Sequence, residues 1–313
     1  MEITAQLVKE LREMTGAGMM DSKKALMETN GDIDQAVEYL RKKGLAGAQK
    51  KAGRIAAEGI VMTKLSFDNK TGVVVEVNSE TDFVAKNEKF RTYVSQVADQ
   101  ALKSNSKNID EFLQEKWDLD NSKTVQDELS SQISIIGENM HIRRTEKLSV
   151  DNGFVCDYIH AGGKIGVLLA VETNVVNDNI KTMAKSVCMQ IAAMRPKFLD
   201  QSYITEDYKK HEMSILLEES KNDPKNAGKP DKIIEGMVTG KYNKLMKEVC
   251  LLDQDFVISN DNEKLSVLKY IEKSAKENNA EVKIKNFVRF ETGEGLEKKN
   301  EDFAAEVAKQ MGM

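Results

Sequence analysis

The feature that most constrains the fold of this chain is an internal duplication. A shift of 94 positions aligns two long segments without a gap, so that residues 72–77 fall on 166–171 and residues 96–98 fall on 190–192. Each copy has the pattern of two β-strands joined by a polar turn and followed by an amphipathic helix. Because the repeat is far longer than a solenoid unit, it predicts a duplicated subdomain.

The loop at 81–87, with the sequence TDFVAKN, departs from this repeat. It follows a β-branched strand expected at 73–77, and the next helix is expected to begin near Asn87. Under the same shift, residues 175–178 (VVND) stand where this loop has Thr81, Asp82, Phe83 and Val84. A residue needed only for the scaffold would be expected in both copies, so the unrepeated Asp-Phe pair favours a special role for Asp82 and Phe83.

The first 55 residues are predicted to form a three-helix unit and a linker. Thr4 can cap the first helix and Gly16 ends it. Asp21 or Ser22 begins the second helix, which ends at Asn30-Gly31. Asp32 or Asp34 begins the third helix, which Gly44 ends.

A basic stretch follows these helices, comprising Lys42, Lys43, Lys50, Lys51 and Arg54. We interpret it as a solvated linker helix, with a nucleic-acid contact as the alternative. The net charge of −5 and the pI of about 5.6 argue against a nucleic-acid binder, because such proteins need a strongly basic surface.

The cysteine content and the apolar segments indicate the cellular compartment in which the chain works. The three cysteines, Cys156, Cys188 and Cys250, are widely spaced and odd in number, which argues against a disulfide framework and for a reducing compartment. No apolar run approaches the ~20 residues that cross a membrane, and the N-terminus has no signal-like segment. We therefore expect a cytoplasmic protein that contacts neither membrane nor nucleic acid.

The two copies predict an α+β fold with core subdomains at 56–150 and 151–296. In the first, a helix at about 123–136 leads to a third strand at 141–144. In the second, a helix at 264–276 precedes a strand at 282–290. Each half is then strand, strand, helix, helix, strand, which gives a small antiparallel sheet covered by helices.

The second half is longer, and the excess predicts an inserted antiparallel helical hairpin at about 204–250. Two polar, helix-prone segments meet at a turn-forming cluster at 222–230. An apolar stripe runs along the second arm: Ile234, Met237, Val238, Tyr242, Leu245, Met246 and Val249. The stripe either packs against the first arm or contacts a second copy of the chain. The sequence does not favour one of these two alternatives over the other.

Several short motifs connect the chain with a known family. They are LVKELR at 7–12, TGAGMMD at 15–21, TDFVAKN at 81–87, IRR at 142–144, KIGV at 164–167, RFE at 289–291 and DFAAEV at 302–307. Each is weak alone, but their order and spacing over almost the whole length are specific. On these residues the chain resembles elongation factor Ts, the guanine-nucleotide exchange factor for elongation factor Tu.

The resemblance implies an N-terminal three-helix domain of the ubiquitin-associated type and a coiled-coil-like hairpin that makes a homodimer or a 2:2 complex. It also implies that Thr81, Asp82, Phe83 and Val84 act on elongation factor Tu. There the phenylalanine inserts between helices of the nucleotide domain, and the pair disturbs the magnesium and phosphate site. The alternatives are a Phe83 buried as an anchor of its own loop and an Asp82 that caps a helix or turn.

The resemblance implies further partner contacts elsewhere. Met19 and Met20 follow a glycine-bearing turn, where flexible apolar side chains suit an adaptable surface, and Lys23 is the polar candidate beside them. The alternatives are core filling for the methionines and a solvated position for Lys23. In a C-terminal helical module at 297–313, Phe303 lies on an apolar face that either docks on the partner or packs on the core.

The segment from His160 to Lys164 superficially suggests a phosphate-binding loop. That motif needs glycine where Tyr158 stands and Ser or Thr where Ile165 stands, so the segment is predicted to be a β-turn at the tip of a hairpin. The resemblance implies that this tip contacts another domain of the partner through His160. The family often has Gly-Ala-Arg here, whereas this chain has Ala-Gly-Gly-Lys.

The sequence shows no catalytic constellation and no Cys or His pair with zinc spacing. We therefore expect an exchange factor that makes no covalent bond and needs no cofactor or metal. One alternative is a ubiquitin-associated-like adaptor without exchange activity, which would not explain the one-sided Asp-Phe loop. The other is an enzyme with its site between the duplicated halves, for which neither copy offers an evident ionisable cluster.

Overall fold

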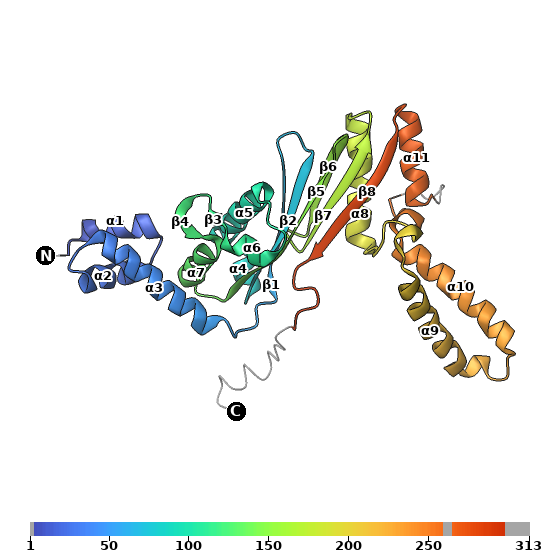
Figure 1. Ribbon diagram of the computed structural model, residues 1–313, viewed down its shortest axis with the longest axis horizontal. Coiled ribbons are helices and arrows are strands. Elements are labelled where there is room, and N and C mark those ends of the chain that lie inside the picture. Colours follow the sequence, from blue (N-terminus) through green and yellow to red (C-terminus); the bar gives the residue numbers. More distant parts are fainter. Residues whose placement is uncertain (1–2, 259–264, 298–313) are drawn as a thin grey trace.

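The computed structural model describes residues 3–258 and 265–297, and it has a mixed α+β fold with small antiparallel sheets (Figure 1). The N-terminal helices are α1 (Ala5–Thr15), α2 (Met19–Glu28) and α3 (Ile33–Lys51). The first half contains β1 (Glu58–Leu65), β2 (Thr71–Ser79), α4 (Asp82–Lys86), α5 (Glu88–Lys103), α6 (Ile109–Gln114), β3 (Lys116–Trp117), β4 (Asp120–Thr124), α7 (Val125–Ile136) and β5 (Met140–Ser149).

The second half contains β6 (Gly153–His160), β7 (Ile165–Thr173), α8 (Asp178–Met194), η1 (Gln201–Tyr203), α9 (Glu206–Asn222), η2 (Pro224–Asn226), α10 (Asp231–Val249), η3 (Leu251–Asp253), α11 (Val267–Glu277) and β8 (Val282–Glu291). The α4 helix, the α6 helix and the β3–β4 ladder were not predicted, and the segment expected as a loop at 82–86 is helical. No described helix is long and apolar enough to span a membrane.

The caps of the N-terminal helices explain most of their bounds. The Thr4 side chain accepts a hydrogen bond from the Leu7 amide, and Gly16 ends α1 with a φ of 67°. The Asp32 side chain caps α3 as predicted. The predicted start of α2 at Asp21 or Ser22 is wrong, because the helix begins at Met19 and the Asp21 carboxylate pairs with Lys43 at 2.5 Å.

The predicted end of the third helix at Gly44 is also wrong. The α3 helix continues to Lys51, so the expected linker helix is its last turns. Gly44 is buried, and a Cβ placed there would lie 3.6 Å from Ser134 Oγ on α7, in ordinary contact. A side chain as small as alanine would therefore fit between α3 and α7, and the Arg41–Asp127 ion pair at 2.7 Å joins the same two helices.

The two halves have the same sheet topology, as the duplication predicted. The strand orders are β1-β2-β5 and β6-β7-β8, and all pairs are antiparallel. The register shifts between Glu76 and Val77 in one sheet and between Ala170 and Val171 in the other, which are equivalent positions under the 94-residue shift. The duplication therefore extends to the irregularities of the backbone.

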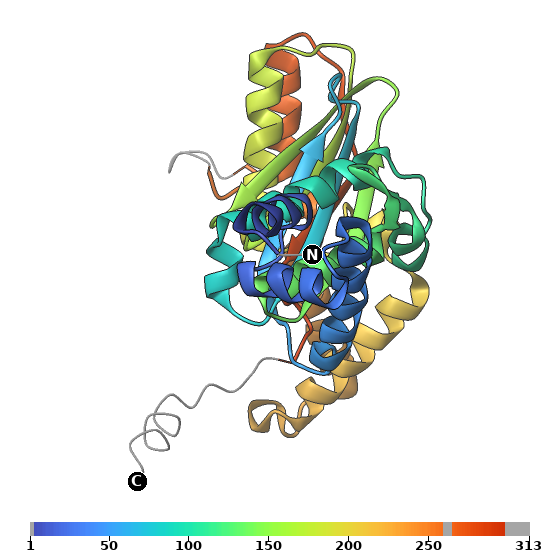
Figure 2. The same cartoon turned by 90° about the vertical axis from the view of Figure 1, so that its left-hand side faces the viewer.

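Helices cover the outer faces of two sheets that pack on each other. On β2, Val74 faces the other sheet, whereas Val73 and Val75 pack with α5 and α7 residues. On β7, Leu168 faces inward and Leu169 packs with α8 and α11 residues. Figure 2 shows α8 and α11 side by side on their sheet. The order of layers is therefore helix, sheet, sheet, helix.

The predicted hairpin is formed by α9 and α10, which project at the end of the molecule opposite to α1–α3 (Figure 1). Its apolar stripe is largely buried within one chain, since Ile234, Val238 and Met246 are at most 4% exposed. Packing between the arms thus accounts for these three side chains. Ile215 and Ile233 stay exposed.

Candidate functional site

Phe83 stands on the surface of the short helix α4. Its side chain is 81% exposed, whereas Ala85 on the same helix is buried. The Thr81 hydroxyl caps the helix by accepting a hydrogen bond from the Val84 amide at 3.3 Å. The alternative in which Phe83 anchors its loop in the core is therefore wrong. Val84 packs at the edge of the first-half core instead.

A carboxylate from a distant part of the chain fixes the start of this helix. Glu138, in the turn after α7, accepts from the Thr81 amide at 3.0 Å and from the Thr81 hydroxyl at 2.7 Å. A second contact joins the same two segments: Glu80, which precedes Thr81, accepts a hydrogen bond from the amide of Asn139, which follows Glu138, at 2.6 Å. Sequence reasoning missed Glu138, because no local pattern relates it to a loop 57 residues earlier.

Asp82 does not cap the helix, because Thr81 does. Its carboxylate pairs with the Lys86 ammonium one turn later at 2.6 Å, and both side chains face solvent. This hydrogen bond, and then the positive charges of Lys86 and Lys164, hold the pKa of the Asp82 carboxyl below its ordinary value. An ionised carboxylate therefore stands directly beside the exposed aromatic ring.

The structure brings the tip of the β6–β7 hairpin next to α4. The segment at 161–164 is a turn, as predicted. Arg91 of α5 donates to the Gly162 carbonyl at 3.0 Å, and the Val61 amide donates to the Gly163 carbonyl at 2.7 Å. The His160 side chain is exposed, and its Nδ1 lies 3.0 Å from the Tyr158 hydroxyl. Residues from both halves thus contribute to one surface.

The other predicted contact residues lie apart from this surface. Met19 and Met20 are 61% and 75% exposed on α2, so core filling does not explain them, and Lys23 is exposed as well. In Figure 1 the α2 helix lies at the N-terminal end of the molecule, away from α4. Phe303 lies outside the described residues.

Comparison with known proteins identifies the family. A family model described as "Elongation factor TS" matches residues 80–294. The chain is 49% identical over 309 residues to elongation factor Ts of Clostridium novyi (strain NT), with 99% of each chain covered. It is 51% identical over 310 residues to elongation factor Ts of Clostridium perfringens (strain ATCC 13124), again with 99% of each covered. This chain belongs to the elongation factor Ts family.

Membership confirms the resemblance drawn from the motifs and makes the chain a translation elongation factor of protein biosynthesis. The family match at 80–294 includes Asp82, Phe83 and Glu138. It begins after α2, whereas the similarity to the whole-length elongation factor Ts sequences also covers Met19 and Met20.

The two halves are joined by one of the motifs on which the resemblance to elongation factor Ts rests, Ile142-Arg143-Arg144. Glu76 is fully buried, and its carboxylate accepts from Arg143 at 3.1 Å, from Arg144 at 2.6 Å and from the Gly293 amide at 2.8 Å. Sequence reasoning found no ionisable cluster between the halves, and this expectation is wrong. The carboxylate is nevertheless saturated with donors, so the cluster holds the halves together and has no free base to offer.

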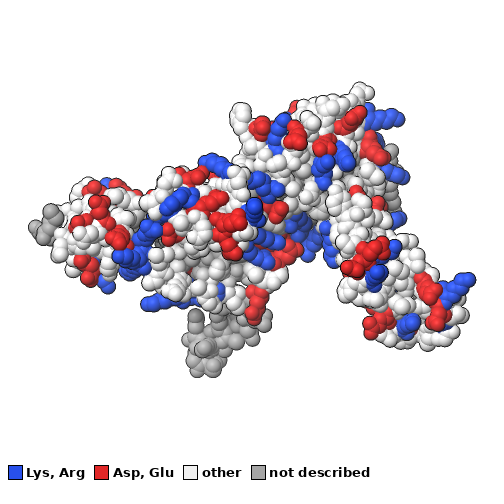
Figure 3. Space-filling model, in the orientation of Figure 1, with Lys and Arg blue, Asp and Glu red and all other residues white. Residues whose placement is uncertain are grey.

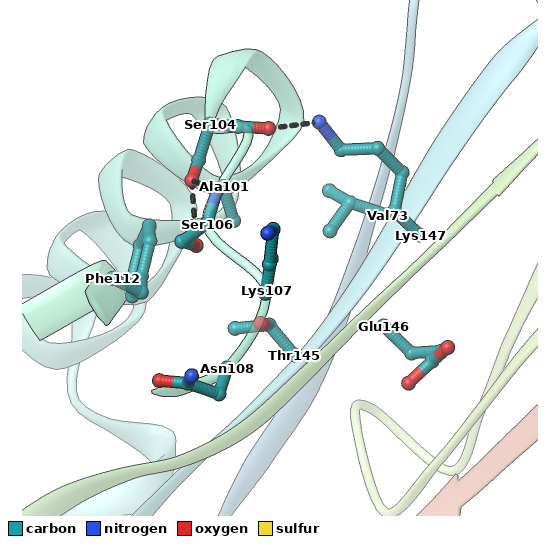
Figure 4. Close-up of a pocket in the computed structure, with 10 residues that line it drawn as sticks. All are labelled: Val73, Ala101, Ser104, Ser106, Lys107, Asn108, Phe112, Thr145, Glu146 and Lys147. Atoms are coloured by element: carbon teal, nitrogen blue, oxygen red, sulfur yellow. Dashed lines mark hydrogen bonds between the residues drawn. The ribbon is translucent and has the colours of Figure 1, made fainter. Parts of the chain in front are cut away.

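A small pocket of about 190 Å³ lies within the first half of this elongation factor Ts relative (Figure 4). It is lined by the end of α5, the start of α6 and β5. Its Lys147 ammonium donates to the carbonyls of Leu102 and Ser104, and burial lowers the pKa of this lysine. Because Lys147 is committed to backbone carbonyls, the pocket is better explained as a packing feature than as a catalytic site.

The charges on the surface match the low net charge of the chain. In Figure 3 acidic and basic side chains are interspersed along the molecule, which gives this face no uniform sign. Among the described residues, no three His, Cys, Asp or Glu side chains lie close enough to hold a metal ion. The candidate site is the exposed surface formed by α4 and the tip of the β6–β7 hairpin.

Proposed function

We propose that this chain promotes the release of GDP from elongation factor Tu, so that GTP can reload. The observation that carries this proposal is the Phe83 side chain, 81% exposed on a helix whose first turn is held by Glu138. A large exposed aromatic ring gains most of its burial only when a partner covers it, as interface hot spots do. A rigid support lowers the entropy lost when it binds.

The mechanism is thermodynamic coupling and makes or breaks no covalent bond. A protein that binds the nucleotide-free partner more tightly than the GDP form weakens GDP binding by the same factor. Phe83 acts as a wedge in the partner's nucleotide domain, and the ionised Asp82 beside it biases the magnesium and phosphate region. The neighbouring ammonium of Lys86 orients the Asp82 carboxylate until the partner competes for it.

Contacts at separate patches would let the complex form before GDP leaves. We assign to Met19, Met20 and Lys23 a contact that strengthens binding to elongation factor Tu. These residues lie in the three-helix N-terminal domain, which we take to be of the ubiquitin-associated type. The His160 tip contacts another domain of the partner, and the C-terminal module with Phe303 adds a further contact. The hairpin of α9 and α10 serves a homodimer or 2:2 complex, for which Ile215 and Ile233 remain exposed. All of this takes place in the cytoplasm.

The test follows fluorescent GDP as it leaves elongation factor Tu in the presence of unlabelled nucleotide. Catalytic amounts of the chain should accelerate release, and the acceleration should saturate as the complex fills. Binding without any acceleration would contradict exchange activity and leave the adaptor alternative. A direct binding measurement on the same samples distinguishes these outcomes.

A further inference from the structure

Two cysteines that lie far apart in the sequence meet in the second half of the fold. Cys156 is on β6 and Cys188 is on α8, which packs on that strand. The Cys188 thiol donates a hydrogen bond to the Cys156 carbonyl oxygen at 3.9 Å. The third cysteine, Cys250, is buried in a different cluster at the base of the α9–α10 hairpin.

The two thiols differ in access. Cys188 is fully buried in the second-half core, whereas Cys156 is half-buried and lines an open pocket of about 590 Å³. This pocket lies between the halves, with Asp68 and Asn69 of the β1–β2 turn on one side and α8 on the other. Cys156 is therefore the more accessible of the two cysteines, because it borders the pocket and Cys188 does not.

The surroundings of Cys156 favour its thiolate. The neighbouring Cys188 thiol and the Lys185 ammonium lower the pKa of the Cys156 thiol, against the opposing effects of burial and of Asp157. Lys185 is held in place by the Asp157 carbonyl at 2.5 Å. Burial raises the pKa of Cys188 well above that of an ordinary thiol. Reactive cysteines have accessible thiolates and often a second cysteine within reach.

We propose that Cys156 and Cys188 form a peroxide-reactive dithiol, in which Cys156 is oxidised first and Cys188 then closes a disulfide between β6 and α8. This inference goes beyond nucleotide exchange and does not rest on it. It also fits the reducing compartment expected from the cysteine spacing, because intracellular disulfides are typically transient and redox-sensing.

Both chemical steps balance with hydrogen peroxide as the oxidant. The Cys156 thiolate attacks one peroxide oxygen, the O–O bond breaks, and the departing hydroxide takes up the thiol proton to give water. Cys156 is then a sulfenic acid. The Cys188 sulfur attacks the Cys156 sulfur, the S–O bond breaks, and hydroxide leaves as water with the Cys188 proton. Overall two thiols are oxidised and one peroxide is reduced to two waters.

The experiment treats the folded full-length chain with hydrogen peroxide, unfolds it under acid, and counts thiols by alkylation and peptide mapping. The thiol count should fall from the three free cysteines to one, which maps to Cys250, and the lost pair should appear as one Cys156–Cys188 linked peptide. Added dithiothreitol should restore all three. Retention of all thiols, or a link to any other cysteine, would overturn the proposal.

Variants separate the two roles. Cys188→Ala should stop at a Cys156 sulfenic acid that dimedone traps, and Cys156→Ser should leave Cys188 reduced. Cys250→Ser is the matched control, and it should form the same link as the wild type. Should Cys188→Ala fail to fold, the mapping of the wild type and of Cys250→Ser still decides. Dimedone labelling of Cys250 in place of Cys156 would contradict the assignment.

Discussion

The Glu138 carboxylate accepts hydrogen bonds from both the amide and the hydroxyl of Thr81, at 3.0 and 2.7 Å, two residues before the exposed Phe83. Glu138→Gln replaces one acceptor oxygen with an amide NH2 group, which cannot accept a hydrogen bond, and removes the negative charge from both contacts. Charge-assisted hydrogen bonds contribute about 1.5–3 kcal/mol. We therefore expect nucleotide exchange to slow by roughly ten-fold, with the far-UV spectrum unchanged.

Thr81 offers the matched test of the same contact. Thr81→Ser keeps the hydroxyl that caps α4 and donates to Glu138, so exchange should remain close to that of the wild type. Thr81→Val removes the hydroxyl and should resemble Glu138→Gln, since the lost cap costs about 1 kcal/mol. Stopped-flow measurement of GDP release compares them. Equal rates for all three variants would show that the order of α4 does not matter for exchange.

The contact between α3 and α7 depends on pH through Asp127. Burial would raise the pKa of the Asp127 carboxyl, but hydrogen bonds with Thr124 and the charge of Arg41 hold it below its ordinary value. A lowered pKa in the folded state stabilises the fold above the unfolded pKa, and this is lost as pH falls through the folded pKa. Asp127→Asn should thus cost about 1 kcal/mol at neutral pH and nothing at strongly acid pH. Thermal unfolding across pH measures this, and a constant difference would contradict it.

Two equivalent glycines test the duplication energetically. Gly59 and Gly153 have φ of 123° and 121°, and a Cβ at either would collide with the carbonyl oxygen of Val77 or Val171. Gly59→Ala and Gly153→Ala should each cost at least ~2 kcal/mol of unfolding free energy. Gly236→Ala is the control, because it lies in α10 with open space around it and should gain up to ~1 kcal/mol. Urea unfolding of all three provides the comparison.

The buried Glu76 should matter far more than an exposed carboxylate with a similar partner. Glu76→Gln removes the negative charge with which both Arg143 and Arg144 pair. It should lower the free energy of unfolding by about 3 kcal/mol. Glu58→Gln removes the exposed pair with Lys164, at 2.5 Å, and should cost less than ~1 kcal/mol. Similar losses for both variants in chemical unfolding would contradict the view that Glu76 joins the halves.

The sequence predicted the parts of the fold that rest on local patterns. The 94-residue shift predicted both β-hairpins, and caps such as Thr4 and Gly16 predicted helix ends. Gly44 was misread because a glycine can end a helix or lie within a helix that packs on a neighbour, and only the position of α7 separates these cases. A local signal could not distinguish them.

The site was predictable only in part. The unrepeated Asp-Phe pair marked Phe83, and its exposure is the property that a partner-contact role requires. Glu138 and Arg91 escaped notice, because they reach α4 through tertiary contacts from the turn after α7 and from α5. Lys164 was named only as part of the hairpin tip, and its effect on the Asp82 carboxyl depends on the tertiary fold. Glu76 was missed as an ionic centre because it looked like one more residue of a β-branched strand.

The most direct test compares Phe83→Ala with Phe67→Ala in fluorescent GDP release from elongation factor Tu. Both side chains are exposed, at 81% and 106%, but Phe67 lies at the β1–β2 turn. Either substitution should change the unfolding free energy by less than ~0.5 kcal/mol. Phe83→Ala should lose about 2 kcal/mol of coupling, or roughly 30-fold in exchange, while Phe67→Ala stays at the wild-type rate. Full exchange activity in Phe83→Ala, or an equal loss in both variants, would contradict the central role of Phe83.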